Sequence, residues 1–193
     1  MNPPEPSAKQ KLRRRLMAAR AAMSAGQRAE YSARIHQRLR ALLQSRFARQ
    51  HTLLCYLALP AEVETRPILA WPGYRFFAPR VHRHTQMHWL RVDATTRWQR
   101  SRWGVEEPIQ GNAWRAEDGG ILLCPLTGFD RTGNRLGMGK GCFDLWLSSH
   151  AHALQAIVGL AFSCQEADSI PVEPHDVPMH FVLTEKECIA CLN

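Results

Sequence analysis

The stretch from residue 121 to residue 144 most constrains how this chain of 193 residues can fold. It begins with the apolar run from Ile121 to Cys124, stops at Pro125, and continues with five glycines between residues 128 and 141. A short apolar run of this kind is typical of a strand buried on both faces. The glycines predict a loop in which backbone N–H groups can approach a ligand closely.

Two basic side chains, Arg135 and Lys140, lie among these glycines. In the G-x-G-x-G spacing from residue 137 to residue 141, successive N–H groups can turn inward and form a nest for an anion. Residues 142–147 predict a helix, whose N-terminal dipole would add to the same anion site. The pattern departs from the Walker A loop and from the dinucleotide-binding fingerprint, and a flexible loop that binds nothing stays open as an alternative.

Asp144 lies in the first turn of this predicted helix. A carboxylate there is stabilised by the helix dipole, and it is also placed to bind a magnesium ion shared with phosphate oxygens. Both interpretations are open from the residues alone. Cys142 follows Lys140 by two residues at the start of the same helix, so we expect a lowered pKa and a reactive thiolate.

Length and composition favour one domain over residues 1–193, because 193 residues with 45% hydrophobic content can bury one good core. The N-terminus lacks the apolar segment of a signal peptide, and no apolar stretch approaches the about 20 residues that span a bilayer. We therefore expect a cytoplasmic protein with no membrane partner. Its six cysteines are expected to be reduced thiols, and no structural metal is expected.

Basic charge is concentrated in the first fifty residues, which hold twelve Lys or Arg and two Glu. This argues against a basic surface spread over the whole protein, as in many nucleic-acid binders, but leaves basic N-terminal helices that could meet a polyanion. A solvated helix face accounts for most of these arginines. A nucleic-acid-associated protein is kept as the non-enzymatic alternative, and it predicts an affinity that falls steeply with salt.

Two capping-box patterns predict helices near the N-terminus. Ser7-Ala-Lys-Gln10 follows a proline-rich tail at 1–6 that we expect to be loose, and Ser24-Ala-Gly-Gln27 opens a longer helix. Lys9 and Arg13 are four residues apart, so they project from one side of the first helix, where two cations could hold a polyphosphate. The predicted apolar stripes are Leu12, Leu16, Ala19 and Met23 on the first helix, and Tyr31, Ile35, Leu39, Leu42 and Phe47 on the second.

Buried-strand patterns alternate with helical ones along the rest of the chain. The strand patterns cover residues 52–57, 74–78, 87–92, 121–124, 156–162 and 181–184, residues 65–71 predict a short helix, and residues 109–118 are expected to form a polar loop. This alternation, with a ligand loop joining a strand to a helix, predicts a three-layer α/β/α domain with a largely parallel, Rossmann-like central sheet.

The run GFDRTGNRLGMGKGCFD, residues 128–144, closely resembles the signature loop of 5-formyltetrahydrofolate cyclo-ligases, also called methenyltetrahydrofolate synthetases. Weaker matches extend from Lys9 to Thr184. The resemblance implies the same fold and the ATP-dependent conversion of 5-formyltetrahydrofolate to 5,10-methenyltetrahydrofolate, with ADP and phosphate released. It also implies Mg²⁺ as the cofactor, and we expect a monomer whose partners are these two small molecules, with no nucleic acid.

The resemblance implies roles for individual residues of this chain. Catalysis is assigned to Arg135 and Lys140, and magnesium binding to Asp144 and Asp176. ATP binding is assigned to Lys9, Arg13, Arg135, Gly137, Gly139, Lys140, Gly141 and Phe143. Folate binding is assigned to Leu57, Glu62, Trp103, Met138 and Cys142. In this assignment the Glu62 carboxylate accepts hydrogen bonds from the pterin N–H groups, and Trp103 stacks on the ring.

The chain departs from the commonest family pattern at three positions. Met138 replaces a residue that is often basic or aromatic, Cys142 stands where tyrosine is usual, and His180 stands where some members carry another acid. These differences concern the folate contacts more than the phosphate loop. The alternative enzyme is another phosphate- or nucleotide-binding member of the same α/β class, such as a sugar-phosphate isomerase-like protein.

Overall fold

The computed structural model describes residues 7–82 and 85–191, so the predicted loose tail at 1–6 lies outside the described residues. The helices are α1 (Ala8–Ala21), α2 (Ala25–Arg46) and α3 (Cys142–His150). The longer strands are β1 (Thr52–Cys55), β2 (Arg75–Val81), β3 (Met87–Val92), β6 (Ile121–Pro125), β9 (Ala156–Leu160), β10 (Phe181–Leu183) and β11 (Cys188–Ala190). Two hairpins pair β4 (Trp98–Arg100) with β5 (Glu106–Pro108) and β7 (Gly128–Phe129) with β8 (Arg135–Leu136). Short 3₁₀ turns are η1 (Arg66–Ala70), η2 (Ala116–Asp118), η3 (Ala151–Ala153) and η4 (Ser163–Gln165).

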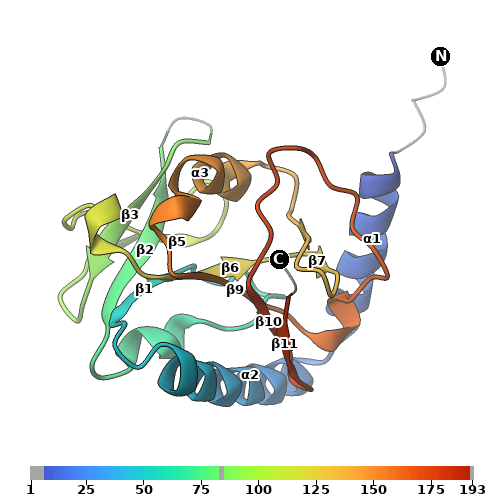
Figure 1. Cartoon of the computed structure of the whole chain (residues 1–193), viewed down its shortest axis with the longest axis horizontal. Coiled ribbons are helices and arrows are strands. Elements are labelled where there is room, and N and C mark those ends of the chain that lie inside the picture. Colours follow the sequence, from blue (N-terminus) through green and yellow to red (C-terminus); the bar gives the residue numbers. More distant parts are fainter. Residues whose placement is uncertain (1–6, 83–84, 192–193) are drawn as a thin grey trace.

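The central sheet has seven strands in the order β11-β10-β9-β6-β1-β2-β3, with helices on both faces (Figure 1). From β10 to β2 all neighbours pair in parallel, whereas β11 and β3 are antiparallel edge strands. This confirms the predicted α/β fold with a largely parallel sheet. The chain leaves β1 toward β2 on one side, and on the other side it runs from β6 through β9 to β10. The order therefore reverses between β1 and β6.

Alternating side chains of the central strands build one core on each face of the sheet. Leu53 of β1 packs with Ile35 and Leu39 of α2, whereas its neighbour Leu54 packs with Leu147 of α3. All five residues are at most 1% exposed. Because successive side chains of a strand point to opposite faces, one apolar strand serves both cores, which is why the central strands read as continuous apolar runs.

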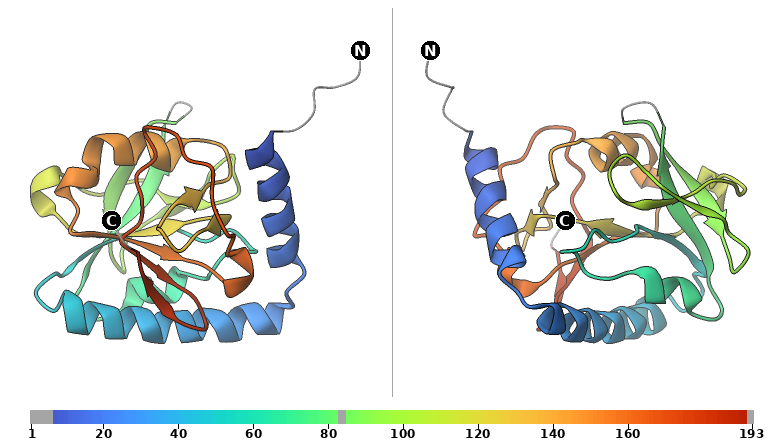
Figure 2. Two further views of the ribbon diagram at one scale, coloured as in Figure 1. Left: turned by 45° about the vertical axis from the view of Figure 1, so that its right-hand side comes forward. Right: turned by 180° about the vertical axis from the view of Figure 1, so that it is seen from behind.

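Helix α1 stands at one side of the sheet, whereas α2 runs along one face (Figure 2). The inner side of α1 contributes Leu16 to a small cluster with Leu136, Ala167 and Ile170. Both predicted capping boxes are present, with Ser7 capping α1 and Ser24 capping α2, and in each the serine and the glutamine three residues later exchange hydrogen bonds. The two helix starts are therefore confirmed.

Some elements are not predicted by the sequence. These are the hairpins β4–β5 and β7–β8 and the edge strand β11, whose strands are short and lack a continuous apolar run. Residues 109–118 form the predicted polar loop, which ends in the 3₁₀ turn η2, but one of its residues is buried. Trp114 is 8% exposed, its ring centroid lies 5.3 Å from that of Trp146, and its indole N–H donates to Gly119 O at 2.8 Å. A single tryptophan therefore anchors this polar segment to the core.

Two properties of the described residues bear on the environment of the protein. No helix among residues 7–82 and 85–191 is both long and apolar enough to cross a bilayer. All six cysteines are free thiols, and Cys55 and Cys124 are buried in the core. Burial raises the pKa of Cys124 to about 11, so that thiol stays protonated near neutral pH.

Replacing Leu122 of β6 tests the core beneath α3. Leu122 is fully buried, so Leu122→Ala is expected to lower the free energy of unfolding by about 2–5 kcal/mol through lost transfer free energy and the cavity left behind. Leu145→Ala is the matched control, because this leucine of α3 is 55% exposed and should change stability little. Urea unfolding measures both variants, and equal costs would contradict the assignment of the core.

Candidate functional site

A deep, mainly apolar pocket lies at the carboxyl ends of β1 and β6, where the strand order reverses. Ligands of open α/β sheets bind in this kind of crevice, because the connections leave it in opposite directions. Counting the solvent at its mouth, the pocket encloses about 920 Å³. One wall is apolar and comes from the segment after β1, from β2 and from β3. The opposite wall is the glycine loop that precedes α3, together with the first turn of that helix.

Most residues that the resemblance singled out line this one pocket. They are Leu57, Glu62, Trp103, Arg135, Gly137, Met138, Gly139, Lys140, Gly141, Cys142, Phe143 and Asp144. Three do not line it: Lys9, Arg13 and Asp176. Two of these, Lys9 and Arg13, project from α1. The roles assigned to all of these residues stay predictions. The structure nevertheless brings twelve of them, from residue 57 to residue 144, to one pocket.

The glycine loop has the backbone geometry of an anion site. Gly139 and Gly141 adopt positive φ angles of 87° and 70°, which side chains with a Cβ rarely tolerate. Gly141 is the N-cap of α3 and provides no side-chain cap. The first N–H groups of α3 therefore receive no capping oxygen from residue 141. They lie at the end of the helix that borders the pocket, where the dipole is positive.

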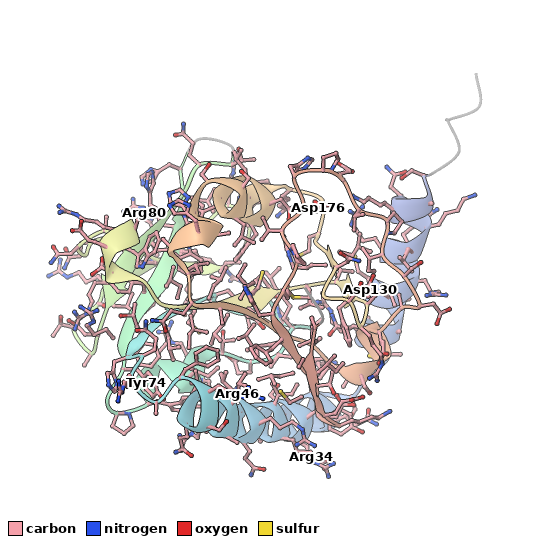
Figure 3. The ribbon with its side chains drawn as sticks, viewed as in Figure 1. Arg34, Arg46, Tyr74, Arg80, Asp130 and Asp176 are labelled. Carbon is pink, nitrogen blue, oxygen red and sulfur yellow. The ribbon has the colours of Figure 1, made fainter. Side chains whose placement is uncertain are left out.

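Asp130 holds the hairpin that carries this loop. It is 3% exposed and lies in the turn that joins β7 to β8, where Figure 3 labels it. Its carboxylate accepts hydrogen bonds from the backbone N–H groups of Thr132, Asn134 and Ile170 and from the Thr132 hydroxyl and the Asn134 amide. Burial opposes ionisation, but the hydrogen bonds from Asn134 and Thr132 outweigh it and hold the pKa of Asp130 below its usual value.

Arg135 and Asp144 form an ion pair inside the pocket. The Arg135 side chain is 4% exposed, and its Nη2 donates to Asp144 Oδ1. Its Nη1 donates to Pro125 O at 3.4 Å, and its Nε has no hydrogen-bond partner among the described residues. The pair fixes the guanidinium between the end of β6 and the start of α3, and the unpartnered Nε keeps one donor available.

Lys140 and Trp103 meet across the pocket. The Lys140 Nζ lies 3.4 Å from the centroid of the Trp103 ring, which is a close cation–π contact. Trp103 belongs to the turn between β4 and β5, and it is 37% exposed. Lys140 is assigned to phosphate binding and Trp103 to pterin stacking. A phosphate on Lys140 or a pterin on Trp103 would therefore compete with the contact between these two side chains.

Two α1 cations also reach this side of the molecule. The Lys9 Nζ lies 2.8 Å from Glu173 Oε1 and 3.4 Å from Asp176 Oδ2. Arg13 Nε donates to Gly137 O at 2.8 Å, so α1 contacts the glycine loop directly. Asp176 lies on the segment that leads toward β10 (Figure 3) and pairs with Lys9 rather than lining the pocket with Asp144.

At the apolar end of the pocket, Glu62 is a buried carboxylate. It is 9% exposed, and its Oε2 accepts a hydrogen bond from Leu59 N at 2.9 Å. Burial raises its pKa, although the Leu59 N–H and the charge of Arg20 oppose that effect. Arg20 Nη1 lies 3.8 Å from Glu62 Oε1. Leu57 is 7% exposed and lines the same wall.

The expected low pKa of Cys142 is wrong. Its pKa is raised, because burial of the thiol outweighs the nearby charge of Lys140. The helix start and the lysine were read correctly, but partial burial was invisible in the sequence. His180, where some family members carry an acid, accepts a hydrogen bond from Ile157 N at 3.0 Å at the start of β10, so this histidine supports the sheet.

Two polar residues near the site, Arg20 and Asp130, are not singled out from the sequence, and Glu107 has no role assigned to it. Arg20 looked like one more surface arginine of a basic helix. Glu107 lines the pocket from β5, is 6% exposed and has a pKa raised by burial. For Asp130 a signal existed, because Asp-x-Thr-x-Asn is a pattern of short side chains that hydrogen-bond to nearby backbone in turns.

The fold and the pocket define a class of α/β protein in which a glycine loop faces an apolar cavity at the switch point of the sheet. Residues 5–185 match the 5-formyltetrahydrofolate cyclo-ligase family. The chain therefore belongs to the 5-formyltetrahydrofolate cyclo-ligase family and is a ligase. The resemblance first noted in the glycine loop is confirmed over nearly the whole chain.

Individual relatives agree with this assignment. The 5-formyltetrahydrofolate cyclo-ligase of Haemophilus influenzae is 30% identical over 183 residues, which cover 91% of this chain and 96% of the relative. That of Mus musculus is 30% identical and covers 93% and 94%. The solved structure of Aquifex aeolicus 5,10-methenyltetrahydrofolate synthetase superimposes with a TM-score of 0.83 at 25% identity, covering 97% of this chain and 94% of the other.

Asp130→Asn tests the hairpin beneath the glycine loop. An amide cannot accept at both of its atoms, so we expect a loss of about 1–3 kcal/mol in unfolding free energy at pH 7. Because the pKa of Asp130 is lowered on folding, its contribution is present above about pH 4 and is lost as the pH falls through the folded value. Urea unfolding of both proteins at pH 7 and pH 3 should show a smaller difference at pH 3. A difference that is independent of pH would contradict the role of the ionised carboxylate.

Proposed function

We propose that this chain cyclises 5-formyltetrahydrofolate to 5,10-methenyltetrahydrofolate with ATP, releasing ADP and phosphate. One observation carries the proposal: a single pocket joins an anion-binding glycine loop with Arg135 and Lys140 to an apolar wall with Glu62 and Trp103. The first half suits a triphosphate, and the second suits a flat heterocycle with N–H donors. A sugar-phosphate isomerase-like enzyme would not need the second half, and family membership removes that alternative.

The chemistry has to overcome a poor leaving group. A formamide oxygen does not depart as hydroxide, so the γ-phosphoryl group of ATP is transferred to it, and ADP leaves. The N10 nitrogen of the folate then attacks the activated carbon with its lone pair and loses its proton. The bond from carbon to the phosphorylated oxygen breaks, phosphate departs, and the methenyl bridge remains.

Catalysis of this kind needs positioning and neutralisation of charge more than a protein nucleophile. Lys140 and Arg135 are the cations of the pocket wall that faces the triphosphate, and the N–H groups at the start of α3 add fixed dipoles. Trp103 and Glu62 hold the pterin at the other end. The apolar wall excludes water from the activated formyl group, which would otherwise be hydrolysed.

The carboxylates near the phosphate end fit a magnesium ion that arrives with the nucleotide. Magnesium prefers oxygen ligands, keeps several waters and is held by one or two carboxylates together with phosphates. Asp144 is 32% exposed and lines the pocket, and Asp176 is 23% exposed, so both keep accessible oxygens. Asp144 would hold the ion from the pocket wall, and Asp176, which pairs with Lys9 outside the pocket lining, is the proposed second ligand. When bound, the ion neutralises phosphate charge.

Both carboxylates are paired with cations assigned to ATP, Asp144 with Arg135 and Asp176 with Lys9. Magnesium can compensate the carboxylates and the triphosphate can compensate the cations. Binding of both together therefore replaces the ion pairs, whereas binding of either alone leaves the carboxylates or the cations uncompensated. We further propose that the protein is a cytoplasmic monomer acting on small molecules, without a nucleic-acid partner. Support for the last point is local: the basic residues Lys9, Arg13 and Arg20 of α1 are engaged with the protein itself.

The direct test follows the absorbance of methenyltetrahydrofolate formed from 5-formyltetrahydrofolate with and without Mg-ATP. Lys140→Ala is expected to lose about 3 kcal/mol of transition-state stabilisation, roughly a hundredfold in rate, because it removes charge at the transferring phosphoryl group. Arg49→Ala, an exposed cation after α2, is the matched control and should be unchanged. Wild-type turnover by a folded Lys140→Ala protein would exclude Lys140 from catalysis.

Asp144→Asn separates metal binding from helix capping. Asparagine keeps the shape and much of the capping ability while removing the charge. We expect a lower rate and a higher magnesium concentration for half-maximal activity. Isothermal titration of Mg-ATP into each protein measures the binding step independently of turnover. An unchanged magnesium requirement would leave Asp144 with a purely structural role beside Arg135.

A further inference from the structure

Helix α1 presents three cations on one side, Lys9, Arg13 and Arg20, at spacings of four and seven residues. These spacings repeat one face of an α-helix, and Leu16 of the same face is packed into the small cluster. Lys9 and Arg13 engage the phosphate end of the site. Arg20 lies a further two turns along, at the folate end, and neither the sequence pattern nor the resemblance gave it a role.

The Arg20 guanidinium is buried against the wall of the pocket. Arg20 is 4% exposed, and its Nη1 donates to the carbonyl oxygen of Leu126 at 3.3 Å. The Nε has no hydrogen-bond partner among the described residues. A buried guanidinium is costly unless an anion compensates it. The carboxylate that faces it is Glu62, with 3.8 Å between Nη1 and Oε1.

The geometry leaves Glu62 able to serve a ligand. At 3.8 Å the pair is an ion pair without a close hydrogen bond, so Oε1 keeps its capacity to accept one. Its Oε2 is held by the Leu59 N–H. Glu62, Leu59 and Leu126 all line the pocket, whereas Arg20 does not. Arg20 therefore acts on the pocket from behind, through the carboxylate.

The other titratable groups around Glu62 do not supply a charge. Burial raises the pKa of Tyr56 well above its usual value and that of Cys124 to about 11, so both stay neutral in the accessible range. The remaining charged side chains of the pocket are on its other walls: Arg135, Lys140, Asp144 and Glu107. Burial of Glu62 favours its protonated form, and Arg20 opposes this.

We propose that Arg20 is a positioning residue for folate binding, which keeps the Glu62 carboxylate ionised and oriented to accept hydrogen bonds from the pterin ring. This inference rests on the proposed function and on the role of Glu62 within it. Without Arg20, the ionised form of Glu62 becomes rarer at neutral pH, and each unit of upward shift in pKa lowers the ionised fraction about tenfold below that pKa.

The test measures dissociation constants for 5-formyltetrahydrofolate between pH 6 and pH 9 by isothermal titration. Arg20→Met keeps an unbranched apolar stem without the guanidinium charge, and Arg20→Lys restores a charge. We expect Arg20→Met to bind 5-formyltetrahydrofolate about tenfold more weakly than wild type at pH 7. The affinity should recover as the pH rises above the pKa of Glu62 in this variant and the carboxylate ionises. Arg20→Lys should lie between Arg20→Met and wild type.

Glu62→Gln provides the matched comparison, since it has no carboxylate to ionise. Its binding should be weak and lack the recovery at high pH, and the double variant Arg20→Met with Glu62→Gln should match Glu62→Gln alone. Binding of a non-hydrolysable ATP analogue with magnesium should be unchanged in Arg20→Met, which shows that the nucleotide end is intact. Thermal melting checks that each variant is folded, and Arg20→Gln replaces Arg20→Met if the latter is not.

Weaker binding with an unaltered pH profile in Arg20→Met would mean that Arg20 only packs, and it would overturn the inference. Additive losses in the double variant would overturn it as well. If the wild-type protein binds the nucleotide analogue but not 5-formyltetrahydrofolate at any pH, the proposed function itself fails, and the role of Arg20 fails with it.

Discussion

The position of the site depends on the divergence of the chain on either side of β1 and β6. These two strands are parallel neighbours, but their following connections depart toward opposite edges of the sheet, so a crevice is left at their carboxyl ends. The segment after β1 supplies Leu57 and Glu62, and the segment after β6 supplies the glycine loop. That the apolar wall and the glycine loop face each other across one pocket is thus a direct consequence of strand order.

Charge within this site is balanced by pairs that each join a cation to a carboxylate. Arg135 pairs with Asp144, Lys9 with Asp176, and Arg20 with Glu62. Each pair joins residues that are distant in sequence or lie on different elements, so the pairs also fix the elements relative to one another. An unpaired charge in a partly buried site is costly, so each pair keeps both its cation and its carboxylate compensated.

The sequence was informative where the signal was local. The glutamine–serine capping boxes of α1 and α2, the apolar run of β6 and the glycines before α3 each determine local geometry by themselves, and each was found. Properties set by packing were missed. The edge strand β11 forms only by pairing with β10, and the pKa of Cys142 depends on burial that its neighbours in sequence do not reveal.

Candidate site residues show the same division. The resemblance to a known family collected twelve residues that now line one pocket, but it did not find Arg20, whose partner is 42 residues away in the chain. Nothing in a basic helix marks one arginine as buried. The single domain and the roles of individual residues stay predictions, since independent folding and ligand binding are properties that experiments on the protein test.

The modest attachment of α1 has a consequence for how the enzyme moves. This helix is held by a small cluster around Leu16, which contacts the protein where Gly128 leaves room for it: a Cβ on that glycine would lie 2.3 Å from Leu16 Cδ1. The rest of its attachment is polar, through the contacts of Lys9, Arg13 and Arg20, so the free energy of local opening of α1 depends on these side chains. Lys9, Arg13 and Arg20 all lie on α1, so the roles proposed for them link ligand binding to the stability of this helix, with slower amide hydrogen exchange in Ala8–Ala21 as the expected sign.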